Sequence, residues 1–234
     1  MVPHGTLHCL AGAEGRAMDH DEAQRAVITV GEGRGFVVEG ARQRLVITAA
    51  HCLPHFPPCA AFSHLEERTY QDLLAPLGEP PKIWAECLFA DPIGDIAVLG
   101  SPDSQALSAQ SEAYEALMES TRPLVIADAP KKGAGWMLSL DGQWFKCDLM
   151  HQDSRIWIIG AAKNIEVGMS GSPIVNDNCF AIGVVCAGLR TDGDRWPSGP
   201  NPRLVHNLPG WLLKELRGDT QGPVTDPTDE LNND

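Results

Sequence analysis

The chain has 234 residues and a formal net charge of −13, from 31 acidic and 18 basic side chains. An anionic field of this size repels phosphate backbones and anionic lipid headgroups, so nucleic acid and membrane surfaces are excluded as expected partners. With 43% hydrophobic and 21% charged residues, the composition is that of a globular protein of one large or two small domains. A peptide or protein is therefore the expected ligand.

No segment of the sequence is suited to a lipid bilayer or to export. The longest apolar run, Phe180 to Leu189, has 10 residues, against the roughly 20 that a helix needs to cross the hydrocarbon. The segment Met1 to Leu7 lacks the basic start and the long apolar core of a secretory signal. The sequence therefore predicts a cytoplasmic protein.

The cysteines support the same prediction. There are seven, an odd number at irregular spacing, so they cannot all pair within one chain: Cys9, Cys52, Cys59, Cys87, Cys147, Cys179 and Cys186. Free, partly buried thiols in a reducing cytoplasm are expected.

Residues 1–25 are polar and are expected to form an N-terminal arm. Short β-branched runs separated by glycine follow, and they predict strands at Val27–Val30, Phe36–Val38 and Leu45–Thr48. Such strand-length segments with turn residues between them are typical of antiparallel sheets or barrels.

The stretch Gly31-Glu32-Gly33-Arg34-Gly35 has the glycine density of a phosphate-binding loop. It lacks the Lys-Ser/Thr ending of such a loop and is followed by no helical pattern. We therefore predict a hairpin turn here.

Residues 53–81 are Pro-rich at both ends and predict a long surface excursion, with a helical stretch near Leu65–Leu74. The strand pattern resumes at Ile96–Leu99. Residues 102–120 read as a polar helix and are expected to link two halves of the molecule.

The second half returns to short apolar runs. Strands are predicted at Leu124–Ala127, Trp136–Leu140, Trp144–Cys147, Ile156–Ile159, Ile174–Val175 and Ala181–Cys186. The pattern from Leu204 to Leu216 predicts a terminal helix with cations in its last turn. Residues 218–234 are polar, acidic and Pro-containing, and we expect a disordered tail.

Three short motifs supply a base, an acid and a nucleophile. They are Thr48-Ala49-Ala50-His51-Cys52, Asp95-Ile96-Ala97-Val98-Leu99 and Val167-Gly168-Met169-Ser170-Gly171-Ser172-Pro173-Ile174. A serine flanked by glycines sits on a tight turn with its hydroxyl exposed, but it needs a neighbouring base to take its proton. Histidine can do this because its unperturbed pKa is ~6.5. A carboxylate on the other ring nitrogen fixes the tautomer.

Each of these residues also has a non-catalytic interpretation. His51 could be a structural histidine at a strand end, and Asp95 a turn residue before a strand. Asp91 competes with Asp95 for the acid role, although no apolar strand starts directly after it. Ser172 is the alternative nucleophile to Ser170, and the glycine–serine turn could have no catalytic role. The order of the three motifs favours the catalytic interpretation.

A metal site is not expected. Two groups of candidate ligands exist, but neither has a second half at zinc-binding spacing: His4, His8 and Cys9, and His51, Cys52, His55 and Cys59.

With the chain order His51, Asp95, Ser170, the sequence resembles the chymotrypsin-like (trypsin-fold) serine peptidases and their bacterial-type trypsin-like domains. The resemblance covers roughly residues 26–216. It implies an all-β fold of two perpendicular six-stranded antiparallel β-barrels with a C-terminal helix. The three residues would lie in the cleft between the barrels.

The resemblance also implies a division of the chain. Residues 26–101 would form the first barrel, with the histidine and aspartate of the triad, and residues 102–120 the helical linker. Residues 121–217 would form the second barrel, with the serine, and the C-terminal helix. The arm at 1–25 and the tail at 218–234 would flank them.

The activity implied is that of a serine endopeptidase that needs no cofactor and passes through an acyl-enzyme. Ser170 would be the nucleophile, His51 the general base and then acid, and Asp95 the residue that orients His51. The N–H groups of Gly168 and Ser170 would form the oxyanion hole, worth ~3 kcal/mol per donor.

The resemblance further implies that the strand Gly183–Gly188 borders the cleft and pairs with an extended peptide, so that Cys186, Ala187 and Gly188 bind substrate. Asn164, six residues before Ser170, would be at the floor of the specificity pocket. Because Asn164 is uncharged, a strong preference for Arg or Lys is not expected. A shifted alignment would instead bring Glu166 there.

Three positions depart from the family pattern. Met169 stands where zymogen-type relatives have an Asp that binds a freed N-terminus, so that activation route should be absent. Cys186 replaces a Ser that often supports the catalytic Asp. Cys52 has no cysteine on the preceding strand to pair with; the nearest upstream is Cys9. The alternative to an enzyme is a catalytically silent peptidase-fold module that binds or regulates peptides.

Overall fold

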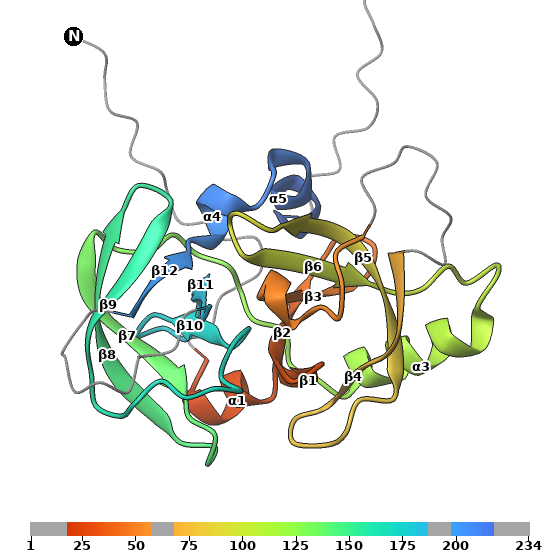
Figure 1. Ribbon diagram of the computed structural model, residues 1–234, viewed down its shortest axis with the longest axis horizontal. Helices are drawn as coiled ribbons and strands as arrows, with labels where there is room; N and C mark the ends of the chain where they lie inside the picture. The colour runs from red at the N-terminus through yellow and green to blue at the C-terminus, as the bar shows by residue number, and fades with distance from the viewer. Residues whose placement is uncertain (1–17, 58–67, 187–197, 218–234) are drawn as a thin grey trace, which may run out of the picture.

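Two β-rich halves lie side by side in the computed structural model, which describes residues 18–57, 68–186 and 198–217 (Figure 1). Strands β1–β6 form one half and β7–β12 the other, with α4 above their junction, α5 above the first half and α3 on the flank of the first half. No helix in these ranges combines the length and the apolar composition needed to cross a membrane.

The first half is a closed barrel with strand order β1-β2-β3-β6-β5-β4, all neighbours being antiparallel. Its strands are β1 Val27–Val30, β2 Gly33–Glu39, β3 Arg44–Thr48, β4 Thr69–Pro76, β5 Ile83–Asp91 and β6 Ile96–Gly100. Val30 pairs with Gly33 across a two-residue turn, and Gly31 takes φ +55° there, which glycine adopts at little cost. The predicted hairpin is confirmed.

The second half is a six-stranded antiparallel sheet of order β11-β10-β7-β8-β9-β12. An isolated bridge between Gly183 of β11 and Arg203, the residue after β12, brings the two edges together, so the sheet curls into a half-closed second barrel. Its strands are β7 Lys132–Leu138, β8 Trp144–Gln152, β9 Arg155–Ala161, β10 Pro173–Val175, β11 Ala181–Val184 and β12 Ser198–Pro202. The expected fold class, two six-stranded β-barrels with C-terminal helical structure, is confirmed.

Three buried clusters hold the molecule together. One fills the first barrel and one the second, the latter around Met137, Leu149, Ile156 and Ile174. The third joins side chains of both halves, among them Phe36 and Ile47 of the first and Val184 of the second, with the C-terminal helices. Burial of this third cluster fixes one barrel against the other, which the site between them requires.

The helix α3, Ser108–Glu119, packs against β5 of the first barrel. Its buried residues Tyr114, Leu117 and Met118 join the core of that barrel. The Tyr114 hydroxyl donates to the Arg44 carbonyl at 2.9 Å. The predicted helix is therefore present, and it covers the first barrel as well as lying between the two halves in sequence.

The segment 124–127, predicted as a strand, makes only isolated bridges. Leu124 is bridged to Val38 of the first barrel and Ile126 to Ala181 of the second, both in parallel orientation. Its backbone therefore spans the junction between the barrels instead of joining one sheet.

The prediction of a helical stretch near Leu65–Leu74 is wrong for residues 69–74, because these belong to strand β4. Residues 65–67 lie outside the described ranges. The register of β4 against β5 shifts between Tyr70 and Leu74, and Asp72 within it has φ +47°. This bulge breaks the two-residue alternation of a strand. The buried residues Tyr70, Leu73 and Leu74 thus follow a helix-like spacing.

Other boundaries differ more mildly. Strand β5 was not predicted, and the expected terminal helix is two helices, α4 Leu204–Asn207 and α5 Gly210–Arg217, separated at Pro209. Proline has no N–H to continue α4 and favours a helix start. A short helix, α1 His20–Gln24, lies within the expected N-terminal arm, and its Ala23 is fully buried.

The packing of α3 can be tested at Tyr114. We expect Tyr114→Phe to lower the free energy of unfolding by about 1 kcal/mol, because the part-buried Arg44 carbonyl loses its hydroxyl donor. Urea denaturation measures this, with Glu115→Gln on the exposed face of α3 as the control. Equal stability of both variants and the wild type would contradict the contact.

Candidate active site

The pairing of β3 with β6 brings His51 and Asp95 together. Thr48 is opposite Ala97 in this antiparallel pair. Continuing that register by two residues from the Thr48–Ala97 pair places position 50 opposite position 95, the residue before β6. His51 lies there on a one-turn helix, Ala50–Cys52, that directly follows β3. The separation of 44 residues in sequence thus becomes a direct contact.

Both oxygens of the Asp95 carboxylate accept hydrogen bonds from His51. The His51 backbone N–H donates to Oδ1 at 3.0 Å, and the ring Nδ1 lies 2.8 Å from Oδ2. An ionised carboxylate only accepts, so Nδ1 carries the proton and Nε2 is left as the acceptor in the neutral ring. The ring is half-exposed, and its free nitrogen is therefore able to serve as a base.

The pair shifts the pKa of each partner. The hydrogen bond to Asp95 raises the pKa of His51, against an opposing effect of burial. Burial by itself would raise the pKa of Asp95, but the hydrogen bonds from the His51 ring and backbone outweigh it and lower the pKa. The two shifts have the signs of an ion pair that stabilises the imidazolium.

The second barrel holds the loop that carries Asp95. Arg155 donates from Nη1 to the Gly94 carbonyl and from Nη2 to the Ile93 carbonyl, both at 3.0 Å. The Cys186 thiol donates to the Asp95 backbone carbonyl at 3.0 Å. These contacts fix Asp95, whose φ of +56° is uncommon for a residue with a side chain.

Ser170 lies in the loop of residues 162–172 between β9 and β10, here called the nucleophile loop. Its carbonyl accepts a 2.7 Å hydrogen bond from the N–H of Arg34 on β2. The next residue, Gly171, has φ +82°, and a Cβ there would lie 1.8 Å from the Arg34 carbonyl oxygen. Only glycine permits this approach of the loop to the first barrel.

The turn that carries His51 and the backbone of Ser170 pack against the same glycine. A Cβ on Gly33 would lie 2.6 Å from the Cys52 sulfur and 2.7 Å from the Ser170 carbonyl oxygen. The fold therefore brings the turn that carries His51, and with it Asp95, next to the backbone of Ser170 at the junction of the barrels.

The backbone around Ser170 leaves two N–H groups available. Met169 donates to the Glu166 carbonyl and Gly171 to the Val185 carbonyl. Within the described part of the chain, the N–H groups of Gly168 and Ser170 have no acceptor. Gly168 has φ +94°, again a conformation suited to glycine. These two N–H groups are the ones predicted to form an oxyanion hole.

Met169 is fully buried in the core of the second barrel. Its sulfur accepts a hydrogen bond from the Glu166 N–H at 3.3 Å. An apolar anchor therefore occupies the position where the resemblance would place an ion pair with a new N-terminus.

The competing residues are in less suitable surroundings. Ser172 is fully buried, and its hydroxyl has no partner among the described residues, whereas Ser170 is half-buried. The Asp91 carboxylate accepts from the Ile93 N–H at 2.9 Å. These positions favour Ser170 as nucleophile and Asp95 as acid.

The residues predicted to bind substrate are only partly described. Asn164 is exposed on the nucleophile loop, beside the buried Ile165, and Glu166 is exposed as well. Cys186 contacts Asp95, as above. Ala187 and Gly188 lie outside the described residues, so the specificity pocket stays a prediction.

Two residues that the sequence did not indicate support the site: Arg34 and Arg155. Their acceptors are backbone carbonyls, which leave no pattern in a sequence. The Gly-Arg-Gly context of Arg34 was the only available sign, because it places a large cation where the backbone is otherwise closely packed.

The described cysteines are all free thiols: Cys52, Cys87, Cys147, Cys179 and Cys186. Cys9 and Cys59 lie outside the described residues. Burial raises the pKa of Cys52, next to His51, to about 11, so this thiol is protonated at neutral pH.

In the described ranges, no three His, Cys, Asp or Glu side chains are grouped as metal ligands.

Comparison with known proteins gives a likeness in structure alone. No family model and no curated protein matches the sequence. An inactive serine-to-alanine mutant of Rv3671c from Mycobacterium tuberculosis H37Rv is 17% identical, with a TM-score of 0.50 over 95% of this chain and 99% of that one. The chain has the trypsin-like fold.

Two viral structures are also similar. The NSP4 proteinase of equine arteritis virus has 18% identity and a TM-score of 0.46, over 76% of this chain and 74% of that one. A structure from work on the Sesbania mosaic virus VPg protein has 12% identity and a TM-score of 0.47, over 78% of this chain and 88% of that one.

The His51–Asp95 pair can be tested by titration. We expect Asp95→Asn to lower the pKa of His51, because the carboxylate that raises it is gone while burial remains. NMR titration of the His51 ring proton measures this. Asp91→Asn is the matched control and should leave the titration unchanged. A His51 pKa unaffected by Asp95→Asn would show that the pair does not form.

Proposed function

We propose that the chain is a serine endopeptidase, a hydrolase that cuts peptide bonds through an acyl-enzyme. The observation that carries the proposal is the double hydrogen bond from His51 to the Asp95 carboxylate, at 3.0 and 2.8 Å, beside the backbone of Ser170. The trypsin-like fold, which can hold such a trio between its barrels, supports it.

In the first half-reaction, His51 Nε2 takes the proton of the Ser170 hydroxyl as Ser170 Oγ attacks the peptide carbonyl carbon. The negative charge on the carbonyl oxygen is stabilised by the N–H groups of Gly168 and Ser170, which have no other acceptor in the described chain. His51 then gives its proton to the leaving amine, and the C–N bond breaks.

In the second half-reaction, water replaces the amine. His51 takes a proton from the water, the hydroxide attacks the acyl carbon, and Ser170 leaves with the proton returned by His51. Asp95 stays ionised throughout, as its lowered pKa requires. Because His51 acts as a base only when neutral, its raised pKa shifts the acid limb of activity above pH ~6.5.

The proposed substrate is an extended peptide or a protein segment, with no cofactor. It would pair with the backbone that continues β11, where Cys186, Ala187 and Gly188 were predicted to bind substrate. Asn164 remains the proposed floor of the specificity pocket. The five free thiols agree with the proposed cytoplasmic location.

The nucleophile is tested with a fluorophosphonate probe. We expect wild type to be labelled and Ser170→Ala to be unlabelled, because the probe forms its bond only with an activated hydroxyl. Ser172→Ala, the matched control two residues away, should retain labelling. A folded wild type that reacts no faster than Ser170→Ala excludes the enzyme, and tight peptide binding without turnover would then favour the silent binding module.

The 234-residue chain should be active without N-terminal processing. Met169 is fixed by burial and needs no newly formed ammonium group to organise the nucleophile loop. Fluorophosphonate labelling of the 234-residue chain, combined with intact-mass measurement, tests this. Labelling that appears only after loss of residues 1–20 would show that activation by cleavage operates after all.

A further inference from the structure

Arg34 is a buried cation with no carboxylate partner. Only 7% of the surface of Arg34 is exposed, and burial lowers the pKa of its guanidinium. Within the described residues, no carboxylate lies within ion-pair distance of it. A charge in such surroundings is costly unless its N–H groups are satisfied by good acceptors. The acceptors that Arg34 uses therefore indicate what it holds in place.

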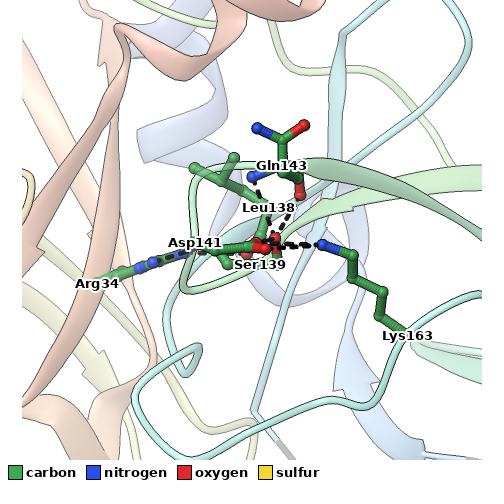
Figure 2. A network of polar contacts seen from close by, with 6 residues as sticks. All are labelled: Arg34, Leu138, Ser139, Asp141, Gln143 and Lys163. Atoms are coloured by element: carbon green, nitrogen blue, oxygen red, sulfur yellow. Dashed lines mark hydrogen bonds and ion pairs between the residues drawn. The ribbon is translucent and has the colours of Figure 1, made fainter.

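Those acceptors belong to the opposite barrel, as Figure 2 shows. Nη1 donates to the Leu138 carbonyl at 2.9 Å and to the Ser139 carbonyl at 3.1 Å, and Nη2 donates to Ser139 at 3.2 Å. Leu138 ends β7 and Ser139 begins the turn to β8. The side chain of Arg34 thus ties β2 of the first barrel to the turn of residues 139–143.

This turn is connected in its own right to the nucleophile loop. The Ser139 hydroxyl lies within hydrogen-bond distance of both the Asp141 carboxylate and the Gln143 carbonyl, which share its single proton. Lys163, at the start of the nucleophile loop, donates to the Asp141 carboxylate at 3.0 and 3.2 Å. Further along the loop, a Cβ on Gly168 would lie 3.5 Å from the Leu140 side chain.

The backbone of Arg34 holds the other end of the same loop. Its N–H donates to the Ser170 carbonyl at 2.7 Å. Its carbonyl accepts from the Thr48 hydroxyl at 2.6 Å and closely contacts Gly171. The backbone of Arg34 therefore contacts Ser170 directly. Its side chain bonds to the turn 139–143, and this turn contacts Lys163 and Gly168 of the nucleophile loop.

We propose that Arg34 is a positioning residue that holds the N–H groups of Gly168 and Ser170 in the geometry of an oxyanion hole. The inference rests on the proposed function, because it concerns the same reaction. It predicts that loss of the guanidinium slows the chemical step and leaves binding of the ground state nearly unchanged, since these N–H groups act on charge that develops only in the transition state.

The planar fork of arginine is required for this role. Its two terminal nitrogens bond two successive carbonyls at once, whereas a lysine ammonium is a single point of charge on a flexible stem. Arg34→Lys should therefore be impaired even though it keeps the positive charge.

The test separates rate from binding with the fluorophosphonate probe. Saturation kinetics give the maximal labelling rate and the half-saturating probe concentration for wild type, Arg34→Met and Arg34→Lys. We expect Arg34→Met to lower the maximal rate by about 10- to 100-fold, less than the roughly 100- to 1000-fold loss that follows removal of an oxyanion-hole donor itself, because the two N–H groups are displaced and not removed. The half-saturating concentration should change less than about 2-fold, and the acid limb of the pH profile should stay in place because the His51–Asp95 pair is untouched.

Arg44 provides the matched control. It also donates to backbone carbonyls, those of Met118 at 2.7 Å and Thr121 at 3.5 Å, but it lies at the end of β3 remote from His51. Arg44→Met should keep the wild-type labelling rate. A folded Arg34→Met with the wild-type maximal rate overturns the proposal. If Arg34→Met does not fold, a wild-type maximal rate in Arg34→Lys overturns it equally.

Amide hydrogen exchange keeps this inference distinct from the proposed function. In the Ser170→Ala background, which needs no activity, Arg34→Met should speed exchange over residues 162–171, while Arg44→Met should not. If wild type is unlabelled but shows this exchange pattern, the peptidase proposal is refuted, and the claim that Arg34 holds the nucleophile loop in place still stands. Labelled wild type with unchanged exchange in Arg34→Met would end the role of Arg34 and leave the peptidase proposal standing.

Discussion

The antiparallel register of β3 against β6 is the constraint on which the site depends. Thr48 opposite Ala97 puts the following helical turn next to the residue before β6. A shift of one residue would reverse the facing of every side chain on the strand and bury polar groups in the barrel. The core of the first barrel therefore determines where His51 meets Asp95. The chemistry of the pair, including both pKa shifts, follows from that contact.

The second barrel contributes to this arrangement through polar contacts with backbone atoms of the first. Arg155 and Cys186 hold the carbonyls around Asp95, while Arg34 crosses in the opposite direction to the turn after β7. Each barrel thus fixes a loop that belongs to the other. Apolar packing between the halves brings them together, and these bonds select one orientation, because a buried N–H without an acceptor costs about 1–3 kcal/mol or more.

The sequence pointed to His51, Asp95 and Ser170 as candidates, since each lies in a short local motif, and it predicted the strands with regular alternation. It failed where the pattern is disturbed, as in β4, whose bulge at Asp72 imitates a helical spacing. It could not indicate Arg34, because the acceptors of this residue are carbonyls 104 and 105 positions away that any residue would present. Contacts to backbone depend on the fold and not on the identity of the partner.

All five described cysteines are free, including those on both sides of the His51–Asp95 pair. The two barrels are thus joined, over the described residues, by packing and hydrogen bonds with no covalent cross-link. Recovery of the described contacts between the barrels after denaturation therefore requires no disulfide from any of these five thiols. The assembly of the site is then governed by the docking of one half on the other, a step that a thiol reductant leaves undisturbed.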